Sequence, residues 1–66
     1  MRIVVNGDER VVPTNITVQE LLTTLEVKSR AVAVERNLEI VPAAEHSTCV
    51  LSEGDRVEIV TLVGGG

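Results

Sequence analysis

The hydrophobic residues at the start of the chain alternate with a period of two, which indicates β-strands. In MRIVVNGDERVVP, the side chains of Met1, Ile3 and Val5 fall on one face of an extended segment. The Asn-Gly-Asp that follows tolerates the positive φ angles that a tight hairpin turn requires. Pro13 has no N–H to donate, so the second strand should end there or lie at a sheet edge. We therefore expect an N-terminal β-hairpin.

The pattern changes to a helical period in NITVQELLTTLEV. Thr17 and Glu20 have the spacing of a capping box, in which each side chain accepts a hydrogen bond from the other residue's backbone N–H. Ile16 and Leu21 have the spacing of a hydrophobic staple around that cap. The apolar positions then follow the i, i+3, i+4, i+7 stripe of a helix packed on one side, namely Val18, Leu21, Leu22 and Leu25. The sequence predicts one helix of two to three turns.

The second half of the chain predicts three main strands and one additional short strand. RAVAVERNLEIVP reads as two strands around Asn37-Leu38, and we expect a looser connection than a tight hairpin, because leucine disfavours positive φ. AAEHSTCV is irregular, with a short strand expected around residues 48–50. In LSEGDRVEIVTLV, a turn at Glu53-Gly54-Asp55 leads into the last strand. The element order β-β-α-β-β-β predicts an α+β fold with a mixed sheet of four to five strands packed on one main helix.

The last predicted strand is apolar on both faces, unlike a strand with one solvated face. Val57 and Ile59 alternate inward, whereas Val60 falls on the outward face beside Glu58. We interpret the outward apolar positions as a surface that docks a partner protein; the alternative is unrelated surface valines, which are common. The residues assigned to the docking surface are Val4, Glu58, Val60, Leu62 and Val63.

Composition excludes several classes of function. The 66 residues include no Phe, Tyr or Trp, so no aromatic platform exists on which nucleic-acid bases could stack. Ten acidic and six basic residues give a net charge of −4, and no basic patch suits nucleic acid or an anionic membrane. A single cysteine excludes an internal disulfide, and no segment has the length of a signal peptide or a membrane span. We expect a cytoplasmic protein.

No group of residues has the spacing of a catalytic or metal site. His46 and Cys49 are the candidates for nucleophilic or zinc chemistry, but a catalytic thiol needs a positioned base and a zinc site needs about four ligands. We interpret Cys49 as a small buried hydrophobic residue and His46 as a surface residue. The remaining reactive group is the α-carboxylate of Gly66, and we expect neither a metal nor a bound cofactor.

The sequence predicts one α+β domain over residues 1–63, followed by a flexible glycine tail, Gly64, Gly65 and Gly66. A carboxylate becomes an acyl donor only when its oxygen is converted into a leaving group, for example by adenylation. Three glycines without Cβ atoms can enter a narrow channel and reach about 10 Å when extended. We expect this tail to thread the active site of a partner enzyme.

The combination of VNG, VAVERN with EIVP, EGDRVEIV and the final VGGG resembles the ThiS family of sulfur carriers over essentially the whole chain. The resemblance implies a ubiquitin-like β-grasp fold and a protein co-substrate that is not itself an enzyme. It implies that a ThiF-like adenylyltransferase uses ATP and Mg to adenylate Gly66, and that sulfur delivered indirectly from a desulfurase then forms a thiocarboxylate. It further implies that the thiazole synthase ThiG accepts this sulfur in thiamine biosynthesis.

Alternative functions have the same fold. The small subunit of molybdopterin synthase shares the Gly-Gly end and the thiocarboxylate, but its chains are usually longer and lack VAVERN. A ubiquitin-related thiolation modifier is a rarer alternative. A β-grasp module that binds a protein without covalent chemistry would carry the glycines as a flexible end, and an independent enzyme would need a catalytic constellation that the sequence lacks.

Overall fold

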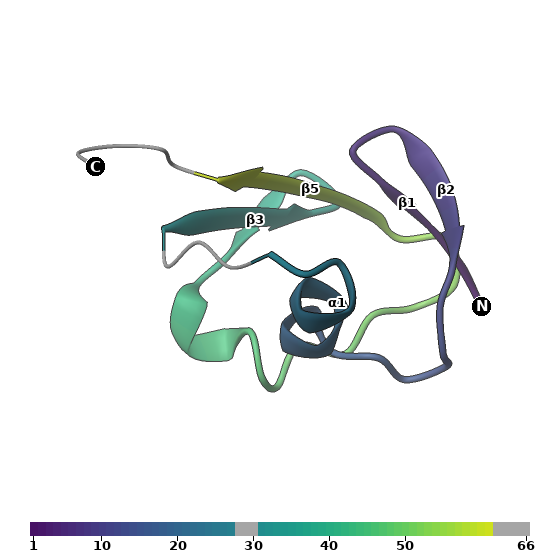
Figure 1. Ribbon diagram of the computed structural model, residues 1–66, viewed down its shortest axis with the longest axis horizontal. Helices are drawn as coiled ribbons and strands as arrows, with labels where there is room; N and C mark the ends of the chain where they lie inside the picture. The colour runs from purple at the N-terminus through teal and green to yellow at the C-terminus, as the bar shows by residue number, and fades with distance from the viewer. Residues whose placement is uncertain (28–30, 62–66) are drawn as a thin grey trace.

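The computed structural model describes residues 1–27 and 31–61, in which one sheet packs against one helix (Figure 1). The elements are β1 (Arg2–Val5), β2 (Asp8–Val11), α1 (Val18–Thr24), β3 (Val32–Arg36), β4 (Glu39–Val41), the 3-10 helix η1 (Ala43–Glu45) and β5 (Arg56–Thr61). The predicted β-β-α-β-β-β order is therefore confirmed, with one short 3-10 helix in addition. The predicted division into residues 1–63 and a tail of 64–66 falls at positions outside the described residues.

The last strand lies in the middle of the sheet, whose order is β2-β1-β5-β3-β4. β5 pairs in parallel with β1, and the other neighbouring strands pair antiparallel, so the sheet is mixed as predicted. Figure 1 shows α1 on one side of the strands, and no helix of the described residues covers the opposite side. The first and last strands of the chain, β1 and β5, are thus neighbours in the sheet, and β5 is its central strand.

The first hairpin forms as the alternating pattern predicts. Asn6 and Gly7 occupy its turn with φ angles of 49° and 87°, the left-handed values that a two-residue hairpin turn needs. Ile3 and Val5 point into the core, and Val11 ends β2 at the edge of the sheet two residues before a proline.

The helix begins at the predicted capping box. The Glu20 backbone N–H donates to Thr17 Oγ1 at 3.1 Å, and the Thr17 backbone N–H donates to Glu20 Oε1 at 2.9 Å. These reciprocal bonds satisfy two donors at the helix start that have no partner within the helix. Ile16 and Leu21, the staple positions, are both buried in the core. The local sequence therefore determines where α1 starts.

The core is built from aliphatic side chains of α1, of the inner face of the sheet and of the segments that connect them. Its buried members are Ile3, Val5, Val12, Ile16, Val18, Leu21, Leu22, Val34, Val41, Leu51 and Val57. Burying apolar area contributes about 25 cal/mol per Å², so many medium-sized side chains can replace a few aromatic ones. The core thus confirms the predicted inward faces of α1, β1 and β5.

The second hairpin is tighter than the sequence predicts. Arg36 pairs directly with Glu39, so only Asn37 and Leu38 form the loop. Both have positive φ, 51° and 70°, as in the mirror-image turn that matches the right-handed twist of paired strands. The expected looser connection is wrong because Asn37 is held by hydrogen bonds to β5, and Leu38 accepts a left-handed conformation while remaining 90% exposed.

The segment between β4 and β5 corrects two further expectations. The strand expected at residues 48–50 is reduced to a single bridge between Val50 and Thr17. His46, expected at the surface, is only 7% exposed, and its Nε2 lies 3.1 Å from the carbonyl oxygen of Val41. The 3-10 helix η1 turns the chain inward at this point, and the imidazole finds a backbone partner that makes its burial tolerable.

Candidate functional site

The candidate site is the outer face of the sheet around β5, because this strand leads to the glycines. Leu62, Val63, Gly64, Gly65 and Gly66 lie outside the described residues. The structure therefore describes the part of the docking surface up to Thr61, where β5 still pairs with β3.

The two faces of β5 separate as the alternation predicts. Val57 is 1% exposed and Ile59 is half-buried against the core, so these residues face α1. Glu58 is exposed on the other face, and Val60 is 53% exposed beside it. The outward orientation expected for Glu58 and Val60 is therefore confirmed.

Val4 lies on the same outer face but at the opposite end of β5. It pairs with Arg56, four residues before Val60. At about 3.3 Å per residue, this register separates the two valines by roughly 13 Å along the strand. Val4 is also half-buried. The structure thus does not bring Val4 together with Val60, because the parallel pairing of β1 and β5 ends before that point.

The outer face includes residues on β3 and β4 that the sequence reasoning did not assign. Glu35 pairs with Glu58, and Ala33 pairs with Val60, across β3 and β5. On the far side of β3, Ile40 of β4 pairs with Glu35 and is 65% exposed. Alternation within VAVERN places Ala33 and Glu35 outward, but their neighbours follow only from the strand order.

Two asparagines hold β5 from opposite sides, and each lies in a hairpin turn. The N–H of Asn6 donates to the Val57 carbonyl at 2.9 Å, and its side chain then bonds both backbone groups of Ile59. Asn37 holds β5 from the β3 side. Its N–H donates to the Arg56 carbonyl, and its Oδ1 accepts from the Arg56 N–H. The strand that leads to the glycines is therefore fixed in place at two points.

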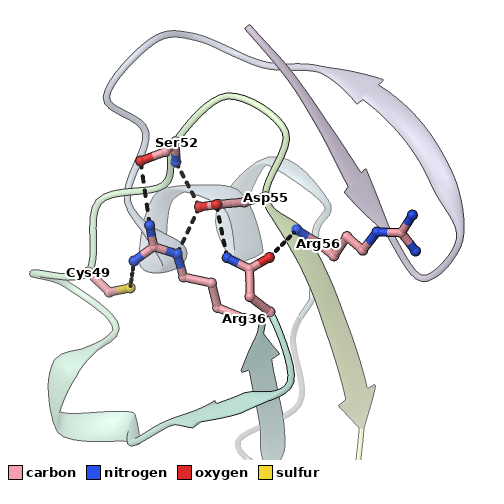
Figure 2. A network of polar contacts seen from close by, with 6 residues as sticks. Arg36, Cys49, Ser52, Asp55 and Arg56 are labelled. Carbon is pink, nitrogen blue, oxygen red and sulfur yellow. Dashed lines mark hydrogen bonds and ion pairs between the residues drawn. The ribbon is translucent and has the colours of Figure 1, made fainter.

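A polar network beside the second turn fixes the start of β5 (Figure 2). Asp55 is buried and accepts hydrogen bonds from the Ser52 N–H at 2.8 Å, from Arg36 Nε at 2.8 Å and from Asn37 Nδ2 at 3.1 Å. The Arg36 guanidinium reaches on to Ser52 Oγ at 3.4 Å and to Cys49 Sγ at 3.9 Å. VAVERN and EGD thus meet in one cluster that holds the β3–β4 hairpin against β5.

This network also sets the charge state of Asp55. Burial by itself would raise the pKa of Asp55, but the hydrogen bonds from Ser52, Asn37 and Arg36 and the positive charge of Arg36 outweigh it. The pKa of this carboxyl therefore lies below its ordinary value. The carboxylate is ionised at neutral pH and serves as the acceptor at the centre of the cluster.

Cys49 and His46, the two residues considered for reactive chemistry, each have other contacts in the structure. Cys49 is a free thiol, half-buried against the core rather than fully buried as expected. His46 uses its Nε2 on a backbone carbonyl. Among residues 1–27 and 31–61, no three His, Cys, Asp or Glu side chains lie close enough together to hold a metal ion. None of the helices in these ranges has the length and hydrophobicity that crossing a membrane requires.

Comparison with known proteins places the whole chain in one group of relatives. The model of the ThiS family matches residues 1–66. The sulfur carrier protein ThiS of Bacillus subtilis is 40% identical over 50 residues, which are 76% of this chain and 76% of that protein. The crystal structure of the thiamine biosynthesis protein ThiS from Geobacter metallireducens superposes with a TM-score of 0.87 at 33% identity, covering all of both chains.

Longer relatives contain the same domain. The thiazole synthase of Paramagnetospirillum magneticum is 50% identical over all 66 residues, and that of Magnetococcus marinus is 36% identical over the same length. This chain spans 20% of the length of each of these two proteins. A domain of this kind is therefore found within larger proteins that are named for a thiazole-forming activity.

Proposed function

Because the chain belongs to the ThiS family, we propose that it is the sulfur carrier of thiamine biosynthesis and acts as a protein co-substrate. The observation that carries the proposal is the family match over residues 1–66 together with a β-grasp structure that aligns over its full length with a ThiS protein. In this function the domain presents a reactive end to partner enzymes and performs no catalysis itself.

We place the chemistry at the α-carboxylate of Gly66, which requires that this carboxylate is free before the protein is loaded with sulfur. One of its oxygens attacks the α-phosphorus of ATP in a ThiF-like adenylyltransferase, and pyrophosphate leaves. A sulfide-level nucleophile then attacks the acyl carbon of the adenylate, AMP leaves with the bonding electron pair, and a thiocarboxylate remains. ATP and Mg belong to the partner, and the dependence on ATP suits a cytoplasmic reaction.

The geometry supports separate roles for the sheet, which would dock the partner, and for the glycine tail, which would enter the partner's active site. β5 is held by Asn6 on one side and Asn37 on the other, so the docking surface is fixed in position up to Thr61. Glu58 and Val60, with Val4 at the far end, would contact the partner, and Leu62 and Val63 would extend this surface. Gly64 and Gly65 would pass through the partner's channel, where a Cβ would clash.

The thiazole synthase ThiG is the acceptor that we propose for the sulfur. Its support is that relatives named thiazole synthase contain this domain, because fusion of a carrier to its acceptor keeps the two at high effective concentration. The desulfurase that supplies the sulfur would act through the adenylated intermediate and need not touch the sheet.

Intact-mass measurement tests the proposal. We expect the purified chain, incubated with a ThiF-like adenylyltransferase, ATP, Mg and sodium sulfide, to gain the mass that corresponds to exchange of one oxygen for sulfur. Omitting ATP, or deleting Gly66, should abolish this change while leaving the circular dichroism spectrum unaltered. An unmodified mass in the complete reaction would contradict the proposal and favour a module that binds without covalent chemistry.

A second measurement separates the two sulfur acceptors. The loaded chain should transfer its sulfur in the presence of thiazole synthase and return to the unmodified mass. Transfer to the large subunit of molybdopterin synthase instead would assign the chain to the alternative pathway.

A further inference from the structure

We infer that the docking face extends from β5 across β3 to β4. We further infer that this face binds an aliphatic partner surface with one arginine or lysine, whose charged group lies between Glu35 and Glu58. The inference rests on the proposed function, because the partner is the adenylyltransferase that would load the glycine tail.

Glu35 and Glu58 face each other directly across β3 and β5. Residues paired in this way have Cβ atoms about 5 Å apart, and like charges in such pairs destabilise a sheet. Within the described part of the chain, neither glutamate forms an ion pair; the two ion pairs that the structure contains there are Arg2–Glu9 and Arg36–Asp55. The folded domain thus contains a pair of like charges that does not stabilise it.

Arg56, the nearest basic residue on the same strand, does not neutralise the negative charge of Glu35 and Glu58. Arg56 lies two residues before Glu58 on the same face, opposite Val4 of β1, and the two side chains do not form an ion pair. Figure 2 shows the Arg56 side chain extending toward β1 and β2, away from Asp55 and the β3–β4 hairpin. Among residues 1–27 and 31–61, no basic side chain forms an ion pair with either glutamate, so a partner protein can supply the positive charge.

Aliphatic side chains border the glutamates on both sides. Val60 follows Glu58 on β5 and is 53% exposed, while Ile40 pairs with Glu35 on β4 and is 65% exposed. Ala33 lies between them on β3, paired with Val60. Such a surface suits an arginine or lysine, because the methylene stem can cover the aliphatic groups while the charged head meets the carboxylates. Exclusion of water by the aliphatic rim would strengthen that attraction.

Charge complementarity selects this occupant over a second copy of the chain. A symmetric dimer through this face would bring four carboxylates together, from two molecules that each carry a net charge of −4. A partner with a basic group instead removes the repulsion within Glu35 and Glu58 when it binds. The pair would therefore lower the stability of the free domain and raise its affinity for the partner.

Glu35→Gln and Glu58→Gln test whether the glutamate pair lowers stability and raises affinity for the partner. We expect each variant to unfold at a higher urea concentration than the wild type, because the repulsion is removed. The same variants should bind the ThiF-like adenylyltransferase roughly tenfold more weakly in calorimetric titrations without ATP. The affinity of the wild type should fall as NaCl is raised, and the double variant should lose most of that dependence.

Glu45→Gln is the matched control, because Glu45 is exposed on η1, outside the sheet, and its loss changes the net charge equally. It should leave affinity unchanged. If the wild type binds and both sheet variants bind as tightly, or if they unfold more easily, the inference is wrong while the proposed function stands. If the wild type neither binds nor becomes adenylated, the proposed function itself fails. A dimer of the wild type in sedimentation that Glu58→Gln strengthens would assign the face to self-association and overturn the inference.

Discussion

The side chain of Asn6 bonds both backbone groups of Ile59: its Oδ1 accepts from the Ile59 N–H at 2.8 Å, and its Nδ2 donates to the Ile59 carbonyl at 3.2 Å. The backbone pairing of β1 with β5 ends at Val5 and Val57. The amide therefore continues the pairing for one more step, after β1 has turned away into its hairpin.

Replacing Asn6 with glycine should loosen the end of β5. Glycine keeps the positive φ of the turn but removes both side-chain hydrogen bonds, so we expect the free energy of unfolding to fall by about 2 kcal/mol. Urea denaturation measures this loss, and hydrogen exchange should show faster exchange at the Ile59 amide. Asn15→Gly is the matched control, because Asn15 also has positive φ, 67°, and its side chain makes no hydrogen bond in the described structure. Equal losses in the two variants would contradict a role for the Asn6 side chain.

Replacing Leu38 with asparagine should stabilise the domain. Leu38 has a φ of 70° and is 90% exposed, so the substitution relieves left-handed strain without removing a packed side chain. We expect a gain of about 1 kcal/mol in the free energy of unfolding, measured by urea denaturation. Val11→Asn, at an exposed position in the extended strand β2, should lower stability instead, because asparagine is unfavourable in strands. A loss of stability in Leu38→Asn would mean that the leucine has a contact within the fold.

Asp55 should make stability depend on pH in the acid range. Its pKa is lowered in the folded protein, so the stabilisation is fully present above its unfolded value of about 3.9 and is lost as the pH falls through the folded pKa. We expect Asp55→Asn to lower the free energy of unfolding by about 3 kcal/mol at pH 7, because Arg36 loses its ionised partner. The difference between variant and wild type should shrink at pH 3. An equal difference at both pH values would contradict this assignment.

Val60→Asp and Val57→Asp should have opposite outcomes. Val60 is 53% exposed on the outer face, so we expect the fold to be retained and binding to the adenylyltransferase to weaken at least roughly tenfold. Val57 is 1% exposed, and an unpaired charge there should cost about 4 kcal/mol or more and prevent stable folding. Circular dichroism and calorimetric titration measure the two effects. A folded Val60→Asp variant with unchanged affinity would remove Val60 from the docking surface.

The sequence by itself determined the elements whose cause is local. The capping box of Thr17 and Glu20, the Asn-Gly turn of the first hairpin and the alternation along β5 each depend on residues a few positions apart, so the sequence predicts them directly. It also determined the inward side of α1, β1 and β5, because burial of the apolar face follows from its period. The family signature, and with it the proposed chemistry at Gly66, was readable in the same way.

Only the tertiary structure decided what depends on strand order. Asn37 is hydrogen-bonded to Arg56 of β5, which is nineteen positions away along the chain. This contact holds Leu38 in a tight turn and outweighs the preference of leucine for negative φ. His46 is buried because η1 turns it toward Val41. The position of Val4 away from Val60, and that of Glu35 opposite Glu58, follow from the register of β5 with its two neighbours. Local patterns specify which face a residue occupies, but pairing between distant segments specifies which residues meet there.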